Sequence, residues 1–402
     1  MCSILWISPY VPYDSVDHAG GKNHNYYVKY FSKKHDYDIT LITLAHERQL
    51  SKIDLDEYGI KNRIGVIKND RWHTLLRYFC NIESEYNPFN RYCGVFSNYQ
   101  RWLLQKQIKD YFNEGTSPDI IILQWTQTVL LMDEIKNFFP NSKIVAIEED
   151  VVFLAYERKM LYAKTFFQRK VWEYKYRKIK KIEIDALKKT ELIVVNNKKD
   201  KRLLISEGLP EDLVCQGPIY YDDYSDVKRN IKNNNVIFYG AMRRKENSLS
   251  ALWFVNEVMP LLEDTDIKFL IIGGGADKLK KIHQNNVEVL GYVADLKPYF
   301  SESLCLVAPL VLGAGIKVKI LEAFSAGIPV ITNHIGIEGI DAIDGKDYFH
   351  CEKAEEYAAK IKELLKNHSV LDTISDSARL YLREEFPLDI ALENLIDMMH
   401  KM

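Results

Sequence analysis

The segment from Gly313 to Thr332, GAGIKVKILEAFSAGIPVIT, joins a glycine turn to an apolar helix pattern. Gly313 and Gly315 allow the backbone to approach a ligand closely. A helix that begins after them directs unpaired N–H groups and a positive dipole end at that ligand. The pattern therefore predicts a site for the two phosphates of a diphosphate.

Two cations and one carboxylate follow this turn. Lys317 and Lys319 fall in the first turn of the expected helix, where cations oppose the helix dipole unless an anion is bound. Glu322 lies among apolar residues, so we expect it to be partly buried and to need partners, which two ribose hydroxyls would supply. The alternatives are a surface pair between Lys319 and Glu322 and a structural ion pair of Glu322.

Other glycine turns end predicted strands in the second half. Gly240 is followed by a cationic run that suits phosphate oxygens or is simply solvated surface, formed by Arg243, Arg244 and Lys245. Gly273 follows the next apolar run. Gly291 ends another one, and there the backbone of Tyr292 and Val293 is a candidate to pair with a nucleobase.

Such turns are expected at the ends of strands. In both halves of the sequence, short apolar runs typical of strands alternate with helical patterns. The runs lie at 3–7, 38–43, 119–123, 143–147 and 192–195, and then at 236–239, 268–272, 287–290, 304–308 and 329–332. This alternation predicts an α/β protein with two doubly wound, Rossmann-like parallel sheets. Ligands of such sheets bind at the carboxyl ends of the strands.

The length of 402 residues fits two domains. A polar, apolar-poor stretch at 221–235 suits a linker, so we predict one domain over 1–220 and a second over 221–385. The last apolar-periodic segment comes too late for the second sheet. We therefore expect residues 386–402 to form a helix that crosses back onto the first domain.

Composition narrows the class of protein. Hydrophobic residues make up 47% and charged residues 27%, and 54 basic against 56 acidic side chains give a net charge of −2, as in an ordinary globular protein. The six cysteines are scattered, without a C-x-x-C pair or a histidine at metal-ligand spacing. We expect a cytoplasmic protein without a metal site, a signal peptide or a membrane span.

Together these turns resemble the nucleotide-sugar-binding domain of retaining glycosyltransferases of the GT-B fold, especially glycosyltransferase family 4, or glycosyl transferases group 1. The resemblance covers residues 236–340 and implies two domains facing a cleft. It implies that Glu322 binds the donor ribose and that Lys319 supplies positive charge. It also implies that the Gly291 segment contacts the base and that three residues lie against the diphosphate and sugar, namely Gly315, Ile316 and Lys317.

Weaker similarity extends to the first half. Gly20 and Gly21 resemble the family's glycine pair, which faces the donor phosphates and the acceptor. Asp150 is the acceptor-side candidate, able to orient or deprotonate an acceptor hydroxyl, or else a solvated loop carboxylate. Two positions depart from the pattern: Ala314 stands where many members have a glutamate, and Glu149 where relatives often have a histidine.

The resemblance implies metal-independent sugar transfer with retention, with Asp150 and Lys317 as the catalytic candidates. The donor is a UDP- or GDP-linked sugar, no cofactor is needed, and the acceptor is a glycan, a lipid-linked saccharide or a protein. The alternatives are a sugar-nucleotide epimerase and a non-catalytic subunit that binds a sugar nucleotide or a glycan.

Two aromatic segments in the first half bear on partners. The basic segment 158–189 is helical in pattern and is either a solvated helix or an interfacial helix at the inner face of the plasma membrane, attracted to anionic lipid. Nucleic acid is not expected as a partner. In the stretch 78–111 we expect the aromatic side chains to pack in the core and the lobe, with part of them forming an acceptor wall.

Overall fold

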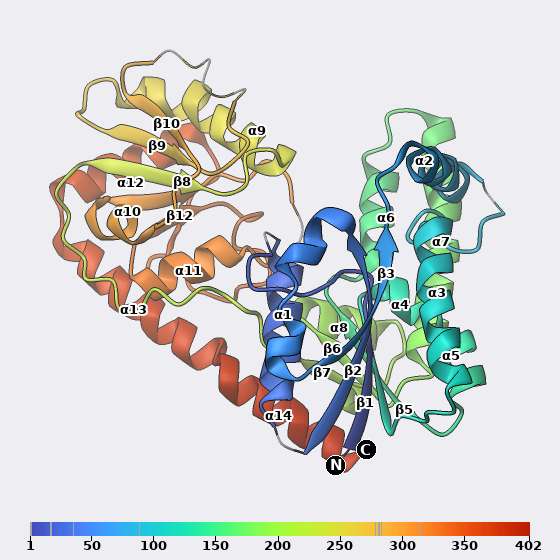
Figure 1. Cartoon of the computed structure of the whole chain (residues 1–402). Coiled ribbons are helices and arrows are strands. Elements are labelled where there is room, and N and C mark those ends of the chain that lie inside the picture. Colours follow the sequence, from blue (N-terminus) through green and yellow to red (C-terminus); the bar gives the residue numbers. More distant parts are fainter. Residues whose placement is uncertain are drawn as a thin grey trace. The chain divides into compact units, whose positions relative to one another are not determined.

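The computed structural model describes residues 2–16, 18–34, 36–87, 89–277, 279, 282, 284–313 and 315–402. The chain divides into two compact units. Unit 1 comprises Met1–Gly217 with Leu392–Met402, and unit 2 comprises Pro218–Ala391. Each unit is a parallel sheet with helices on both faces, and the two sheets with the returning helix give the two-domain fold predicted from the sequence (Figure 1).

Unit 1 contains a seven-stranded sheet in the order β3-β2-β1-β4-β5-β6-β7, with parallel pairing throughout. Apolar side chains on both faces drive its burial, and all five residues of β4 are buried. The strands are β1 (Cys2–Ile7), β2 (Tyr37–His46), β3 (Lys61–Ile67), β4 (Ile120–Gln124), β5 (Lys143–Glu148), β6 (Leu192–Val195) and β7 (Val214–Gln216).

The helices of unit 1 connect these strands and cover the sheet (Figure 1). They are α1 (Ala19–Ser32), α2 (Arg71–Tyr86), α3 (Asn98–Asn113), α4 (Thr126–Val129), α5 (Met132–Phe138), α6 (Val152–Leu161), α7 (Phe166–Leu187) and α8 (Lys198–Ser206).

The last helix of the chain, α14 (Leu388–Lys401), packs on unit 1 as the sequence predicted. Its buried side chains belong to the same hydrophobic cluster as residues of α1 and of the sheet, and are Leu392, Leu395, Ile396 and Met399. At the rim of this contact the carboxylate of Glu393 accepts hydrogen bonds from the side chains of Tyr30 and Lys34, both in or next to α1.

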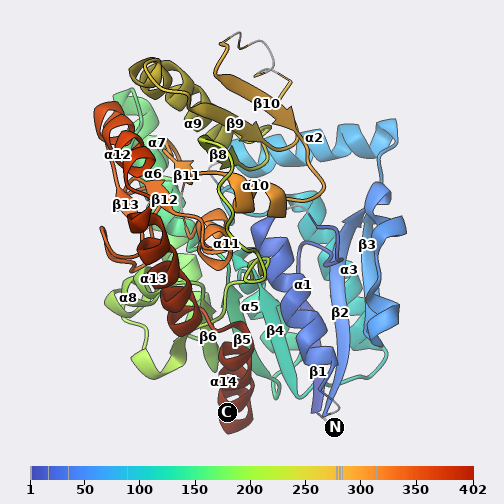
Figure 2. The ribbon, with the colours of Figure 1, turned by 90° about the vertical axis from the view of Figure 1, so that its left-hand side faces the viewer.

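Unit 2 contains a six-stranded parallel sheet in the order β10-β9-β8-β11-β12-β13. Figure 2 shows it from another side. Its strands are β8 (Asn235–Tyr239), β9 (Lys268–Ile272), β10 (Val287–Gly291), β11 (Cys305–Ala308), β12 (Val330–Thr332) and β13 (Phe349–His350). The helices are α9 (Lys245–Trp253), α10 (Lys297–Glu302), α11 (Val318–Ala326), α12 (Ala354–Lys366) and α13 (Ser369–Glu385).

Two expectations about unit 1 need correction. The segment 158–189 is not one helix, because α6 ends at Leu161 and the side chain of Thr165 caps a new helix, α7, by accepting from the N–H of Gln168. The aromatic stretch 78–111 is only partly core: Tyr92, Phe96 and Tyr99 are buried, whereas the aromatic side chains of α2 face solvent. Within the described ranges, no helix is long and apolar enough to cross a membrane.

Candidate donor site and acceptor-side residues

Three glycine turns meet at the carboxyl edge of the unit 2 sheet. The N–H of Gly273 donates to the carbonyl of Gly291 at 2.6 Å, and the N–H of Met242 donates to the carbonyl of Gly274 at 2.8 Å. Gly273 has a φ of 138°, and a Cβ placed on it would lie 1.8 Å from the carbonyl oxygen of Gly240. Only glycine fits there, so the turns after β8, β9 and β10 form one tightly packed backbone edge.

Glu322 lies on α11 with only 6% of its surface exposed. The hydroxyl of Tyr239, at the end of β8, donates a hydrogen bond to its Oε2, and the N–H of Asp222 lies 3.5 Å from its Oε1. Burial and the Glu322 charge both raise the pKa of Tyr239, so its hydroxyl keeps its proton and serves as a donor. The expected partial burial of Glu322 is confirmed, and the exposed surface pair considered for it is wrong.

The ammonium group of Lys319 lies beside Glu322 on the same helix. Its Nζ donates to Oδ1 of Asn247 at 2.7 Å and lies 4.4 Å from the ring centre of Phe238. Burial lowers its pKa from 10.5 to about 7, and the nearby charge of Arg244 adds to this effect. A cation held in so unfavourable a place is the kind of group that an incoming anion stabilises.

The loop before α11 positions the other predicted cation. Gly313 and Gly315 both have positive φ angles, of 142° and 71°, which favour glycine. Lys317 is the N-cap residue of α11 and therefore lies just before the first turn in which it was predicted. Its Nζ donates to the carbonyl of Gly315 and lies 3.8 Å from Oε2 of Glu338. Ile316 packs against the apolar cluster around α11. Ala314 lies outside the described residues.

The three cations that follow β8 have different surroundings. Arg243 is exposed and abuts the glycine edge, because a Cβ on Gly275 would lie 2.9 Å from Cβ of Arg243. Arg244 pairs with Glu246, its Nε lying 2.6 Å from Oε1. Lys245 is exposed at the first residue of α9. After β10, Tyr292 is exposed, and Val293 packs against the apolar cluster that contains Tyr239.

The predicted glycine pair of unit 1 lies in the first turn of α1. A Cβ on Gly20 would lie 3.4 Å from the ring of Trp125 and 3.6 Å from Oε2 of Glu149. Gly21 donates its N–H to Nδ1 of His18. Trp125 has a φ of 69°, which is rare for a residue with a side chain and marks a constrained turn after β4. The glycine pair therefore lies against the carboxyl ends of β4 and β5.

Glu149 and Asp150 follow β5 and differ in burial. Asp150 is exposed, whereas Glu149 is buried and accepts hydrogen bonds from the side-chain amides of Gln124 at 2.6 Å, Asn196 at 2.9 Å and Asn23 at 3.2 Å. Burial raises the pKa of Glu149 to about 7. None of these three amide partners was predicted from the sequence, although Gln124 and Asn196 directly follow predicted strands.

The structure thus gathers the candidates at two sheet edges. Those of the second half lie at the carboxyl edge of the unit 2 sheet, and Gly20, Gly21 and Asp150 lie at the carboxyl edge of the unit 1 sheet. Among the described residues no cluster of histidine, cysteine, aspartate or glutamate has the form of a metal site.

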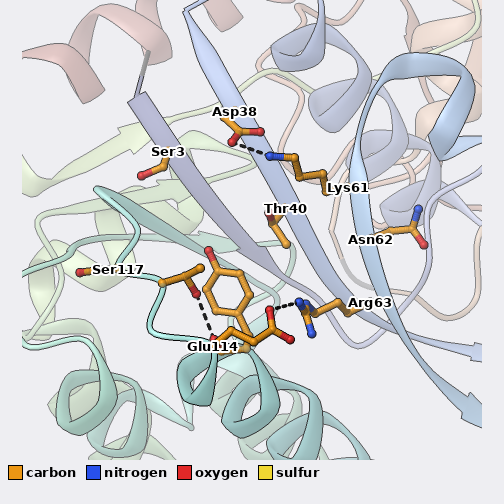
Figure 3. A pocket seen from close by; sticks show the side chains of 10 residues that line it. Ser3, Asp38, Thr40, Lys61, Asn62, Arg63, Glu114 and Ser117 are labelled. Atoms are coloured by element: carbon orange, nitrogen blue, oxygen red, sulfur yellow. Dashed lines mark hydrogen bonds and ion pairs between the residues drawn. The ribbon is translucent and has the colours of Figure 1, made fainter.

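A separate hollow of about 560 Å³ lies at the opposite, amino-terminal edge of the unit 1 sheet (Figure 3). Its charged groups are paired: Lys61 lies 2.7 Å from Asp38, and Arg63 pairs with Glu114. None of the predicted site residues lines it. It is therefore not the candidate site.

A family comparison decides the nature of unit 2. Residues 233–367 match the family described as glycosyl transferases group 1. This region is a group 1 glycosyltransferase domain. The match covers the glycine turns, the cationic run and α11, and the predicted family is confirmed for this part of the chain.

Solved structures are also similar to the chain over its whole length. A structure of Anabaena HepE in complex with UDP-glucose has a TM-score of 0.65 and 13% identity, over all of both chains. Sucrose-phosphate synthase from Thermosynechococcus elongatus has a TM-score of 0.70 and 11% identity, over 100% of this chain and 99% of that one. At such low identity these structures show the shared two-domain GT-B fold.

One curated sequence is also similar. An uncharacterized 44.6 kDa protein in the cps region of Klebsiella pneumoniae is 27% identical over 214 residues. The similarity covers 48% of this chain and 54% of that protein, so the chain spans about half the length of the curated relative that it matches.

Proposed function

We propose that this chain transfers a sugar from a nucleotide diphosphate sugar to an acceptor hydroxyl, with retention of the anomeric configuration. The observation that carries this function is the arrangement of Lys319 and Glu322 on α11, next to the glycine edge, inside the region that matches the family. A buried carboxylate and a partly buried cation at the carboxyl edge of a parallel sheet suit a ribose and a diphosphate.

In this proposal the ribose hydroxyls donate to Glu322, which keeps Tyr239 as its protein partner. The phosphates lie over the loop of Gly313, Gly315 and Ile316, against the N-terminus of α11. Lys317, Lys319 and the cationic run, Arg243, Arg244 and Lys245, supply positive charge. The base lies beside Gly291, Tyr292 and Val293, and Gly240 and Gly273 form the floor of the site. Uracil is the preferred base, since the HepE structures contain UDP or UDP-glucose.

The chemical step breaks the bond between the anomeric carbon and the diphosphate oxygen and forms a bond from that carbon to the acceptor oxygen. Lys317 and Lys319 stabilise the charge that develops on the leaving diphosphate, so the step needs no metal ion. Asp150 receives the proton of the acceptor hydroxyl or orients it. Gly20 and Gly21 leave room for the phosphates and the acceptor.

We further propose that residues 1–220 with the crossing helix bind the acceptor and that residues 221–385 bind the donor. The acceptor is a glycan, a lipid-linked saccharide or a protein, and the protein works in the cytoplasm, at the inner face of the plasma membrane. The basic helices within 158–189 suit an anionic surface, since eight cationic and two acidic side chains lie between residues 157 and 178. The relative encoded in a cps region favours a role in polysaccharide biosynthesis.

The donor proposal is tested by thermal unfolding with a panel of UDP-, GDP- and dTDP-sugars. We expect one UDP-sugar to raise the unfolding temperature, and Glu322→Ala to weaken its binding by about 1 to 3 kcal/mol, because two hydrogen bonds to a charged acceptor are lost. Unchanged affinity in that variant would remove the ribose assignment. Stabilisation without any release of nucleotide, with acceptors present, would favour a binding subunit, and interconversion of the sugar nucleotide would favour an epimerase.

A further inference from the structure

Helix α2 presents its apolar side chains to solvent rather than to the core. Residues His73, Arg77, Cys80 and Ser84, spaced by three and four, form its inner face, and there the hydroxyl of Ser84 accepts from the N–H of Asn98 at the start of α3. The opposite face is exposed and apolar, and consists of Trp72, Leu75, Leu76, Phe79, Ile82 and Tyr86. A globular helix normally has the reverse arrangement.

The turn between α6 and α7 adds to this exposed face. Leu161, Tyr162, Phe166 and Phe167 each have more than half of their surface exposed, with 78% for Phe166. The C-terminal end of α2 contacts α7, since Nζ of Lys175 donates to the carbonyl of Glu85. In both views α2 and this turn lie at the same end of unit 1 (Figure 1 and Figure 2). We call these exposed side chains of α2 and the α6–α7 turn the aromatic face.

We propose that the aromatic face docks on an anionic lipid surface. Single exposed apolar residues are ordinary, but ten of them on neighbouring elements mark a binding surface. Tryptophan, tyrosine and phenylalanine suit the boundary between lipid headgroups and acyl chains. The apolar side of α2 then lies in that boundary, parallel to the membrane plane.

Charge selects the kind of lipid. Lys164, Arg169 and Lys170 are exposed at the turn and the start of α7, within the cationic segment 157–178, and Nζ of Lys170 lies 5.8 Å from the ring centre of Phe166. Cations beside inserted aromatic rings favour anionic headgroups, whose attraction adds for each lysine or arginine near the surface.

The charge and the aliphatic content of the aromatic face argue against two other occupants. A second copy of the chain in a two-fold contact would place this cationic segment against itself. Nucleic acid binds through base stacking on aromatic rings, but Leu75, Leu76 and Ile82 make much of the α2 face aliphatic. A lipid surface accommodates both features. This docking does not depend on the proposed sugar transfer, and it assigns to α2 a role other than an acceptor wall.

The test is co-sedimentation of the full chain with vesicles of phosphatidylcholine alone or with phosphatidylglycerol, at low and high salt. We expect binding to the anionic vesicles that salt weakens. Trp72→Ser with Phe79→Ser is expected to lower the partition constant by more than about tenfold, and Phe166→Ser with Phe167→Ser to do the same. Lys164→Gln with Arg169→Gln should weaken the preference for anionic lipid, because two of the eight cations in 157–178 are removed.

The matched control is Ile343→Ser with Leu380→Ser, two exposed apolar residues of unit 2, which should leave binding unchanged. Circular dichroism checks that every variant is folded. Docking on lipid would be refuted if the α2 variant bound like the wild type, or if neutral and anionic vesicles bound equally. Concentration-dependent self-association that the same α2 variant abolishes would instead identify a second copy as the occupant.

Discussion

Lys319 gives the sharpest test of the donor site, because its protonation should change when the diphosphate binds. In the free protein burial lowers its pKa to about 7, so about nine-tenths of the molecules carry a neutral Lys319 at pH 8. Two phosphate charges near Nζ favour the ammonium form and raise the pKa again. Restoring the ordinary value of 10.5 corresponds to at most about 5 kcal/mol of interaction.

The sign follows from linkage. Because the complex holds its proton more tightly than the free protein, binding takes up a proton at a pH between the two pKa values. We expect uptake of about 0.9 proton at pH 8 and about 0.1 at pH 6, and an affinity that falls by up to about tenfold for each pH unit above 7.

Isothermal titration calorimetry measures this uptake, with a UDP-sugar in buffers of different ionisation enthalpy. Lys319→Met should bind more weakly at pH 6 and should show no buffer dependence at pH 8. Lys245→Met, which removes an exposed cation of the same site, should weaken binding but keep the proton uptake. Equal buffer dependence in the wild type and Lys319→Met would refute the placement of the diphosphate beside Lys319.

Three further outcomes are expected. Gly273→Ala should lower the unfolding temperature and weaken donor binding, since its Cβ would lie 1.8 Å from the carbonyl oxygen of Gly240. The control is Gly59→Ala, at a glycine that also has a positive φ, of 67°, but whose Cβ would meet no atom within 4 Å; it should cost only backbone strain of about 1 kcal/mol. Asp150→Asn should reduce kcat with little change in donor affinity, and a loss confined to donor affinity would contradict an acceptor-side role. The free energy of unfolding in urea should fall between pH 5 and pH 8, because the pKa of the buried Glu149 is raised to about 7 and in this range the folded state holds a proton that the unfolded state has lost. The contribution is at most about 3 kcal/mol, and the Glu149→Gln variant should show a smaller fall.

The sequence predicted most of the donor side because its signals are local. A glycine at the end of an apolar run, such as Gly240 or Gly273, reports a strand end and a tight turn, and the structure places both at the carboxyl edge of one sheet. The burial of Glu322 followed from its apolar neighbours in the helix. The partner of Glu322, Tyr239, could not be predicted in this way, because it lies 83 residues away in the sequence and on β8, which pairs with β11, the strand before α11.

The other features depended on long-range packing. Strand β3, with the sequence KNRIGVI, contains no continuous apolar run and is held by its pairing with β2. The three amides around Glu149 come from α1 and from the ends of β4 and β6. The period of α2 indicates an amphipathic helix but does not tell which face is buried, and in the structure it is the face with Ser84 that contacts the start of α3.

The central claim, sugar transfer with retention, is tested most directly by NMR analysis of the product formed from an α-linked UDP-sugar and candidate acceptors. We expect UDP to be released in step with a new α-linked glycoside, and the Glu322→Ala variant to form it more slowly. A β-linked product would contradict retention, and neither release of nucleotide nor any new glycoside with UDP-, GDP- or dTDP-sugars would contradict the transfer itself.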